Sequence, residues 1–221
     1  MANIDKFRRW LKEPSDLEAV TERFKEEAAW HSWCKPETMN ILNYITSECL
    51  DEDESYLEIG TFMGTSLIAA LKDNQVLASV IDPLQDVTAV GTTYDLWNKA
   101  LIKFGIQDRV SLYRTSCETL NESVLPKVGL YYYDGNHDSG HTYEGLKKFE
   151  KTLSDHSIIM VDCYNIIGGH SQRVFPGHRL DINYPVKTDV DRWLAENPDA
   201  TLETITPWWH GQAIITYRRT Q

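Results

Sequence analysis

Short, almost entirely apolar segments alternate with longer amphipathic stretches through most of the chain after residue 50. Continuous hydrophobicity in a short segment is typical of a strand that is covered on both faces, and alternation with helices favours a parallel sheet. Strands are predicted at residues 55–59, 76–81, 109–113, 128–133 and 157–161. Helices are predicted at residues 65–73, 94–104, 142–153 and 189–199.

The segment ahead of the first predicted strand has a helical pattern instead. Ser15 and Glu18 have capping-box spacing at the start of residues 17–30, and Pro36 is placed to open a second helix. We therefore expect residues 1–50 to form a helical extension that either covers a functional site or pairs two subunits.

The C-terminal part adds two strand-like runs at residues 201–209 and 211–219, which can pair as an antiparallel hairpin at a sheet edge. The predicted fold of residues 51–221 is a doubly wound α/β domain. Its sheet is mostly parallel, with an antiparallel C-terminal hairpin.

Composition and charge limit the class of protein. The 221 residues, of which 42% are hydrophobic, are enough to bury one sizeable core. A formal net charge of −11 argues against nucleic acid or an anionic membrane as a partner, because phosphate binding relies on a positive surface. The four cysteines form no CxxC pair, and the sequence has no apolar leader or membrane-length apolar run. We expect a soluble, cytoplasmic protein, whose charge is compatible with a small or cationic ligand.

Carboxylates occur where the predicted strands end. Glu58 precedes Gly60 at the end of the first strand, and Asp82, Asp134 and Asp162 end the second, fourth and fifth. In open α/β sheets, ligands bind beyond the carboxyl ends of the strands. Carboxylates in such a partly dry crevice need a cation, a metal or a donor hydroxyl as a partner. The pattern therefore indicates a ligand that offers positive charge or hydroxyl groups.

The turn after the first strand, residues 60–64 (GTFMG), narrows the choice of ligand. It lacks the lysine of a phosphate-binding P-loop, and Phe62 occupies the second glycine position of a dinucleotide fingerprint. Asp82, at the end of the next strand, is placed to accept both hydroxyls of a ribose. These residues favour a nucleoside without phosphates, although glycines also occur at such turns for backbone reasons alone.

Four motifs in this order resemble the class I methyltransferases that use S-adenosylmethionine. Residues 58–66 (EIGTFMGTS) and 80–83 (VIDP) resemble the first two motifs of that family. Residues 133–137 (YDGNH) resemble the Asp-Gly-x-His strand end of a small-molecule subgroup, and residues 158–165 (IIMVDCYN) resemble its next strand. Residues 208–211 (WWHG) are also similar to the last hairpin of that subgroup. The resemblance implies a Rossmann-like methyltransferase fold from about residue 54 onward.

The resemblance also implies a site for the methyl donor. The amides around Gly60 would lie near the amino-acid end of S-adenosylmethionine, Glu58 would hold its ammonium group, and Asp82 would take the ribose. Ser116 would lie near the adenine, although its neighbours have capping-box spacing that instead predicts a helix start. The implied cofactor-binding residues are Glu58, Gly60, Thr61, Gly64, Ser66, Asp82, Ser116 and Asp134.

The implied reaction is methyl transfer to a small molecule, at oxygen more often than at nitrogen. The acceptor must lose a proton, either to a general base or with the help of a divalent metal. His137 and Asp134 are the implied catalytic residues. His137 is favoured over His141, although the HTYEG segment that begins at His141 fits the family pattern as well.

A metal route is implied by Asp134 and Asp162, because related metal-dependent methyltransferases place oxygen ligands at these strand ends. Mg²⁺ or another divalent cation is therefore a candidate cofactor. Cys163 departs from the pattern, since the subgroup usually has a second aspartate there and thiolate suits softer ions. Asn165 is a candidate for the missing oxygen ligand. This departure keeps open a catalytically silent protein that binds S-adenosylmethionine or S-adenosylhomocysteine; a nicotinamide-dependent oxidoreductase is a weaker alternative.

Residues 164–185 have no clear period and are long for a connection in a compact domain, which indicates a lid or substrate loop. Its basic residues are candidates for acceptor contacts, or simply form an exposed loop; they are His170, Arg173, His178 and Arg179. Four tryptophans could line an aromatic acceptor pocket or pack in a core; they are Trp30, Trp33, Trp208 and Trp209. The expected partner is a small-molecule acceptor; a second copy of the chain is a further candidate, if the N-terminal helices pair subunits rather than cover the site.

Overall fold

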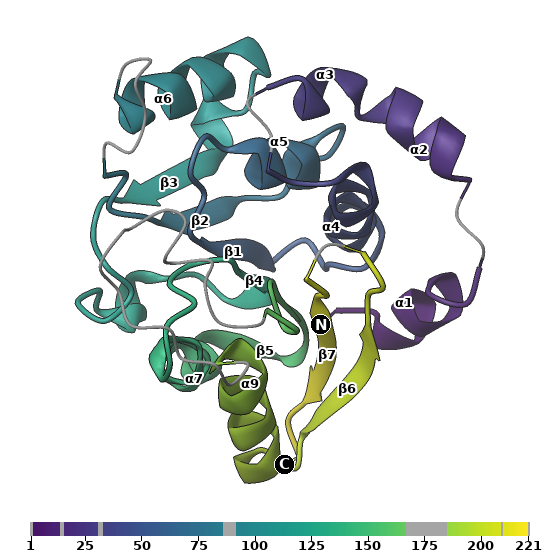
Figure 1. Ribbon diagram of the computed structural model, residues 1–221, viewed down its shortest axis with the longest axis vertical. Helices are drawn as coiled ribbons and strands as arrows, with labels where there is room; N and C mark the ends of the chain where they lie inside the picture. Colours follow the sequence, from purple (N-terminus) through teal and green to yellow (C-terminus); the bar gives the residue numbers. More distant parts are fainter. Residues whose placement is uncertain are drawn as a thin grey trace.

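The computed structural model describes residues 2–13, 16–30, 33–85, 92–166, 185–208 and 210–220, which form a seven-stranded sheet with helices on both faces (Figure 1). The predicted cap Ser15, Trp209 and the basic residues of the predicted substrate loop lie outside these ranges. The strands are β1 (Ser55–Ile59), β2 (Ala78–Ile81), β3 (Val110–Tyr113), β4 (Val128–Tyr133), β5 (Leu153–Val161), β6 (Ala200–Ile205) and β7 (Ala213–Arg218).

The strand order is β3-β2-β1-β4-β5-β7-β6. The first five strands pair in parallel, and β7 is antiparallel to both β5 and β6. This arrangement confirms the predicted doubly wound sheet with an antiparallel C-terminal hairpin. The winding reverses between β1 and β4, which is where open α/β sheets bind ligands.

Helices cover the sheet in two sets. The helices are α1 (Ile4–Trp10), α2 (Leu17–Arg23), α3 (Lys25–Ala28), α4 (Pro36–Glu48), α5 (Thr65–Leu71), α6 (Thr93–Lys103), α7 (His141–Phe149) and α9 (Pro185–Glu196), with 3-10 turns η1 (Gln107–Arg109), η2 (Glu122–Val124) and η3 (Glu150–Thr152). One core cluster joins α1, α4, α5 and α6 to one face of the sheet. A second core joins α7 and α9 to the other face.

Most element predictions are confirmed, and the differences have local causes. β1 and β4 have the predicted bounds. β5 begins four residues earlier than predicted, because the exposed Asp155 and half-buried His156 interrupt its hydrophobic pattern. The helix predicted over residues 17–30 is divided at Phe24, whose fully buried ring packs beside Met39 and Ala69.

The capping-box spacing of Thr115 and Glu118 does not begin a helix. The chain instead forms a turn there, in which Thr119 donates a hydrogen bond from its hydroxyl to the Ser116 carbonyl over 3.1 Å. Short polar side chains that bond to nearby backbone compete with helix formation, which explains the difference.

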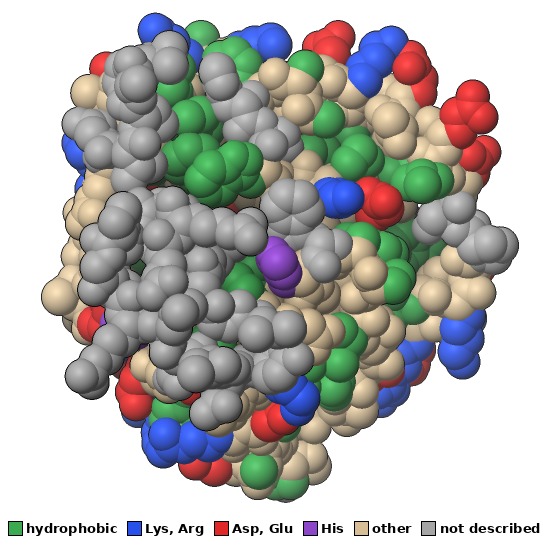
Figure 2. Space-filling view, viewed as in Figure 1, with side chains coloured by type: hydrophobic (Ala, Val, Ile, Leu, Met, Phe, Trp, Pro, Cys, Tyr) green, Lys and Arg blue, Asp and Glu red, His purple; other side chains and the backbone are tan. Residues whose placement is uncertain are grey.

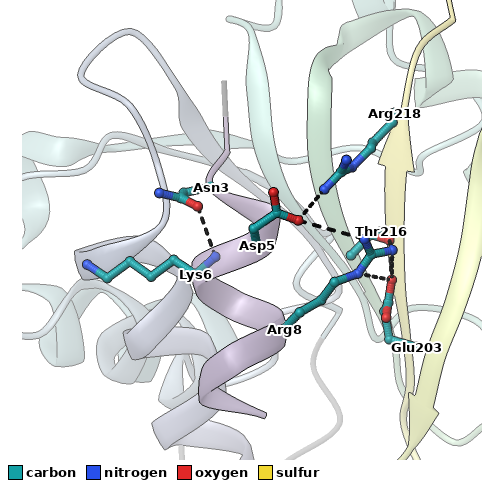
Figure 3. Close-up of polar contacts among 7 residues, drawn as sticks. All are labelled: Asn3, Asp5, Lys6, Arg8, Glu203, Thr216 and Arg218. Carbon is teal, nitrogen blue, oxygen red and sulfur yellow. Dashed lines mark hydrogen bonds and ion pairs between the residues drawn. The ribbon is translucent and has the colours of Figure 1, made fainter. Parts of the chain in front are cut away.

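The N-terminal helix α1 folds back onto the C-terminal hairpin (Figure 3). Arg8 donates from Nε to Glu203 Oε1 of β6 over 2.8 Å, and Arg218 of β7 pairs with Asp5 over 2.6 Å. Phe7, on the inner face of α1, is fully buried in the first core cluster. The predicted helical extension therefore shares the core of the sheet that follows it.

None of the helices in the described part of the chain combines the length and apolar character needed to cross a lipid bilayer. Figure 2 shows acidic and basic side chains interspersed around the rim of one face of the molecule, with hydrophobic groups between them.

Candidate functional site

The turn between β1 and α5 contains three residues with left-handed backbone. Gly60 has φ +79°, Gly64 has φ +85° and caps α5, and Phe62 between them has φ +48°. A Cβ on Gly60 would lie 2.2 Å from the carbonyl oxygen of Asp134, so only glycine lets the ends of β1 and β4 approach this closely. Phe62 is an L-residue in a sparsely populated conformation, a feature that clusters at ligand sites.

Asp82 holds this turn from the end of β2. Its Oδ2 accepts the amides of Thr61 and Phe62 over 2.7 and 3.1 Å, and its Oδ1 accepts the amide of Leu84 over 2.6 Å. A carboxylate has about four acceptor positions, so about one position is left for a hydroxyl donor beside these three amides. The ribose contact assigned to Asp82 from the sequence stays a prediction.

Glu58 is a fully buried carboxyl on the site side of β1. It accepts hydrogen bonds from Tyr56 Oη at 2.7 Å and from Ser66 Oγ at 2.6 Å. Burial raises the pKa of Glu58 to about 7, although these hydroxyl donors oppose the shift. Ser66, one of the predicted cofactor residues, is buried as the donor to Glu58.

Strand alternation places three carboxyl groups on the same face of the sheet. Tyr132 of β4 and Met160 of β5 belong to the core cluster of α4 and α5, so Asp134 and Asp162, two residues further along, project toward the same side. Glu58 is in register with Tyr132 and shares that side. Removal from water, then repulsion from Asp162 and Glu58, raises the pKa of Asp134 well above its usual range. In the described part of the chain, none of these three carboxyls forms an ion pair with a lysine or arginine.

Asp162 is held by a relay of buried side chains. Its Oδ1 accepts from Gln212 Nε2 over 2.7 Å, and Gln212 Oε1 accepts from Thr38 Oγ1 over 3.0 Å. Its Oδ2 lies 3.0 Å from the thiol of Cys163, which donates to it. Burial, with Asp162 and Asp134 adding to it, raises the pKa of the Cys163 thiol.

The structure places the two candidate histidines differently. His137 Nε2 lies 3.6 Å from Asp134 Oδ1, and 14% of its side chain is exposed. His141 begins α7 and bonds through Nδ1 to Glu118 over 3.0 Å. Three possible metal ligands lie within 4.8 Å of one another: a ring nitrogen of His137, a carboxylate oxygen of Asp162 and the sulfur of Cys163.

Two further predicted residues lie at the margin of this arrangement. Asn165 is exposed, and its Nδ2 is close to Gly211, where a Cβ would come within 2.8 Å of it. Ser116 lies in the turn after β3, with its hydroxyl 3.3 Å from that of Thr119. Metal ligation by Asn165 and the adenine contact of Ser116 stay predictions.

The segment before α4 lies over the glycine turn. The sequence predicted that the N-terminal residues either cover a functional site or pair two subunits, but it did not predict which part of the site they would cover. The carbonyl of Trp30 accepts from Thr65 Oγ1 over 2.9 Å, and the ring of Trp33 stacks on Phe62 with centroids 4.8 Å apart. Burial, then the charges of Asp134, Asp162 and Glu58, raises the pKa of the Cys34 thiol well above its usual range. Sequence reasoning missed Cys34, because its proximity to the carboxyls has no local signal.

Residues 57–164 match a family described as a methyltransferase domain. No curated protein matches the chain in sequence. The family match supports a methyltransferase domain in the part of the chain that contains Glu58, Asp82, Asp134 and Asp162.

Solved structures share the fold over almost the whole chain at low sequence identity. A protein from Corynebacterium glutamicum has a TM-score of 0.66 at 13% identity, over 99% of this chain and 98% of that one. A Bacillus cereus O-methyltransferase in complex with S-adenosylhomocysteine has a TM-score of 0.59 at 15% identity, over 98% of both chains. A methyltransferase from Podospora anserina, bound to S-adenosylhomocysteine, has a TM-score of 0.57 at 19% identity, over 94% of this chain and 89% of that one.

Proposed function

We propose that this protein is a methyltransferase that uses S-adenosylmethionine to methylate a hydroxyl group of a small molecule. The observation that carries the proposal is the convergence of Glu58, Asp134 and Asp162 beside a left-handed glycine turn, within the residues that match a methyltransferase family. Buried carboxyls that pair with no lysine or arginine of the described ranges favour a cationic ligand, and a sulfonium compound with an ammonium group is one.

The residues around the turn fit such a donor. S-adenosylmethionine supplies a methyl group already activated on a positively charged sulfur. The carboxylate of Glu58 would stabilise the ammonium group of the donor. The pKa of Glu58, about 7, allows this carboxyl to ionise near neutral pH. Asp82 would accept a ribose hydroxyl at its remaining acceptor position, and Ser116 would lie near the adenine. Thr61 and Gly64 contribute the backbone of the turn.

His137 and Asp134 fit the removal of the acceptor's proton. Histidine ordinarily has a pKa near neutral pH, and a carboxylate beside it orients the ring and stabilises its protonated form. The distance of 3.6 Å from His137 Nε2 to Asp134 Oδ1 allows this pairing. Alignment of the reacting groups can contribute on the order of 7–11 kcal/mol to lowering the barrier.

The residues do not fit a Mg²⁺ cofactor. Mg²⁺ prefers oxygen ligands in octahedral geometry. Near Asp162 the donor groups are the carboxylate of Asp134, the ring of His137 and the thiol of Cys163, so nitrogen and sulfur stand among the oxygen donors. Proton removal is therefore assigned to His137 and Asp134 without Mg²⁺.

Calorimetry with S-adenosylhomocysteine tests the donor site. We expect saturable binding, weakened at least about 10-fold by Glu58→Gln, because one charge-assisted contact is worth about 1.5–3 kcal/mol. Glu144→Gln, on the exposed face of α7, is the matched control and should bind as the native protein does. Absence of binding by the native protein would refute the proposal.

Turnover separates an enzyme from a silent binding protein. Release of S-adenosylhomocysteine in the presence of a panel of hydroxylated small molecules should depend on His137 and persist in His141→Gln. Binding without turnover on any acceptor, with His137→Gln unchanged in affinity, would favour the silent binding protein instead.

A further inference from the structure

Three different kinds of metal donor meet at the carboxyl ends of β4 and β5. An imidazole nitrogen of His137, a carboxylate oxygen of Asp162 and the sulfur of Cys163 all lie within 4.8 Å of one another. A tetrahedral Zn²⁺ holds its ligands at about 2.0–2.3 Å, which places the donors roughly 3–4 Å apart. Their separations therefore exceed the spacing around such an ion by no more than roughly 1–2 Å.

We propose that His137, Asp162 and Cys163 form a binding site for a borderline divalent cation such as Zn²⁺ or Co²⁺, in preference to Mg²⁺. Nitrogen and thiolate donors favour these ions, whereas Mg²⁺ requires a shell of oxygen atoms. The inference goes beyond methyl transfer, because metal binding can be measured without a methyl donor or an acceptor.

The carboxylate donor is positioned before any ion arrives. Gln212 donates from Nε2 to Asp162 Oδ1 over 2.7 Å, and Thr38 in turn donates to Gln212 Oε1 over 3.0 Å; both side chains are nearly fully buried. The antiparallel register pairs Val161 with Ala213, so Gln212 reaches Asp162 from the adjoining strand. Supporting hydrogen bonds of this kind orient the ligands of protein metal sites.

The thiol donor is also held in place, because the backbone around Cys163 is hydrogen-bonded to the C-terminal hairpin. Cys163 has φ +57°, in the left-handed region that a residue with a side chain rarely adopts. The two amides that follow it donate to the hairpin, from Tyr164 to the Gly211 carbonyl over 2.9 Å and from Asn165 to the His210 carbonyl over 2.7 Å. Strain held by surrounding structure is characteristic of ligand sites.

The charge around the three donors also suits a dication. Asp134 Oδ1 lies 3.6 Å from His137 Nε2, and Glu58 is close enough to Asp134 to raise its pKa. Binding replaces the thiol proton of Cys163 with the metal and releases that proton to solvent. The negative charge that results is offset by the ion.

A bound ion would also compete with the proposed base. The imidazole has one lone pair available, which either accepts a proton or binds the metal. Loading with Zn²⁺ should therefore lower methyl transfer. This consequence alone rests on the proposed function; if Zn²⁺ binds and raises turnover, the assignment of His137 as the base is wrong while the metal site stands.

Titration with Co²⁺ tests the site directly. The metal-free protein should develop a thiolate-to-cobalt charge-transfer band with one equivalent of Co²⁺, and Zn²⁺ should abolish it, whereas millimolar Mg²⁺ should not. Cys163→Ser should lose the band and bind Zn²⁺ at least about 10-fold more weakly. Cys117→Ser, at another partly buried thiol beside a carboxylate, is the matched control and should keep the band.

A second variant keeps the proposal testable if the first is unstable. Aspartate tolerates left-handed backbone better than most residues, so Cys163→Asp should fold, lose the cobalt band and gain competition by Mg²⁺. His137→Gln should weaken Zn²⁺ binding, and His141→Gln should not. A native protein without the band, or one whose Zn²⁺ affinity is unchanged by Cys163→Ser and His137→Gln, would overturn the proposal.

Discussion

Individual residues in and around the glycine turn stabilise the fold in addition to their proposed roles in binding. Gly60 lets the backbone of Asp134 approach, and Ser66 donates to the buried Glu58. Asp82 already accepts three backbone amides. Such residues fix the shape of the turn, so substitutions there act on stability and on binding together.

We expect Gly60→Ala to destabilise the protein by several kcal/mol, because it combines left-handed strain of about 1–2 kcal/mol with a clash against backbone. Gly105 is the matched control, since it has φ +65° and open space where its Cβ would lie. Gly105→Ala should cost only the conformational strain. Urea unfolding of both variants measures the difference, and equal losses would show that the Asp134 contact is unimportant.

The buried Glu58 should make stability depend on pH. Its folded pKa of about 7 lies above the ordinary value of 4.5, so the folded state binds the proton more tightly. This contribution is complete below about pH 4.5 and is lost as the pH rises through 7, a decline on the order of 3 kcal/mol. Glu58→Gln should reduce the slope of unfolding free energy between pH 5 and 8. Identical slopes in variant and native protein would contradict the assignment.

At the scale of elements, contacts made elsewhere in the chain decide where helices end. The amphipathic run over residues 17–30 predicts one helix, but burial of Phe24 divides it into α2 and α3. Likewise α1 is fixed by ion pairs with the C-terminal hairpin (Figure 3). Those pairs join residues 195 and 213 positions apart in the sequence, and their coupling free energies should differ with burial.

A double-mutant cycle on Arg8 and Glu203 should give a coupling free energy of about 1 kcal/mol, because the pair is partly buried and Thr216 also donates to Glu203. The pair of Asp5 and Arg218 is the control, since both side chains are well exposed. Its coupling should be close to zero and vanish in high salt. Equal couplings would mean that burial is not the determining factor.

At the scale of the whole molecule, the N-terminal helices and the sheet share one core. Ile4 and Phe7 of α1 pack in the same cluster as residues of β1, β4 and β5. The segment that follows α3 lies over the glycine turn through Trp30 and Trp33. The extension and the candidate site therefore belong to the same folded body in the described ranges.

Phe7→Ala should lower the free energy of unfolding by about 3–5 kcal/mol, as expected for a large ring removed from a core. Unfolding should remain a single transition when followed by circular dichroism and by tryptophan fluorescence. Leu17→Ala, at an exposed position, should change stability by less than about 0.5 kcal/mol. A separate early transition in Phe7→Ala would show instead that the extension unfolds independently.

The sequence by itself determined the sheet and the rim of carboxyls. Continuous hydrophobicity is a local signal, so β1 and β4 were predicted at their observed bounds. Carboxyl ends of parallel strands meet at one edge, which is why Glu58, Asp134 and Asp162 could be expected together. These inferences needed only the order of residues along each strand.

Only the tertiary structure decided which other side chains reach that rim. His137 lies beside Asp134 whereas His141 bonds to Glu118, although both fit the same sequence pattern. Gln212 holds Asp162 from 50 residues away. The position of Cys34 near the carboxyls depends on how the N-terminal segment crosses the turn. Such contacts form when distant segments pack together. They cannot be predicted from hydrophobic periodicity, because the local sequence around each residue does not indicate its partner.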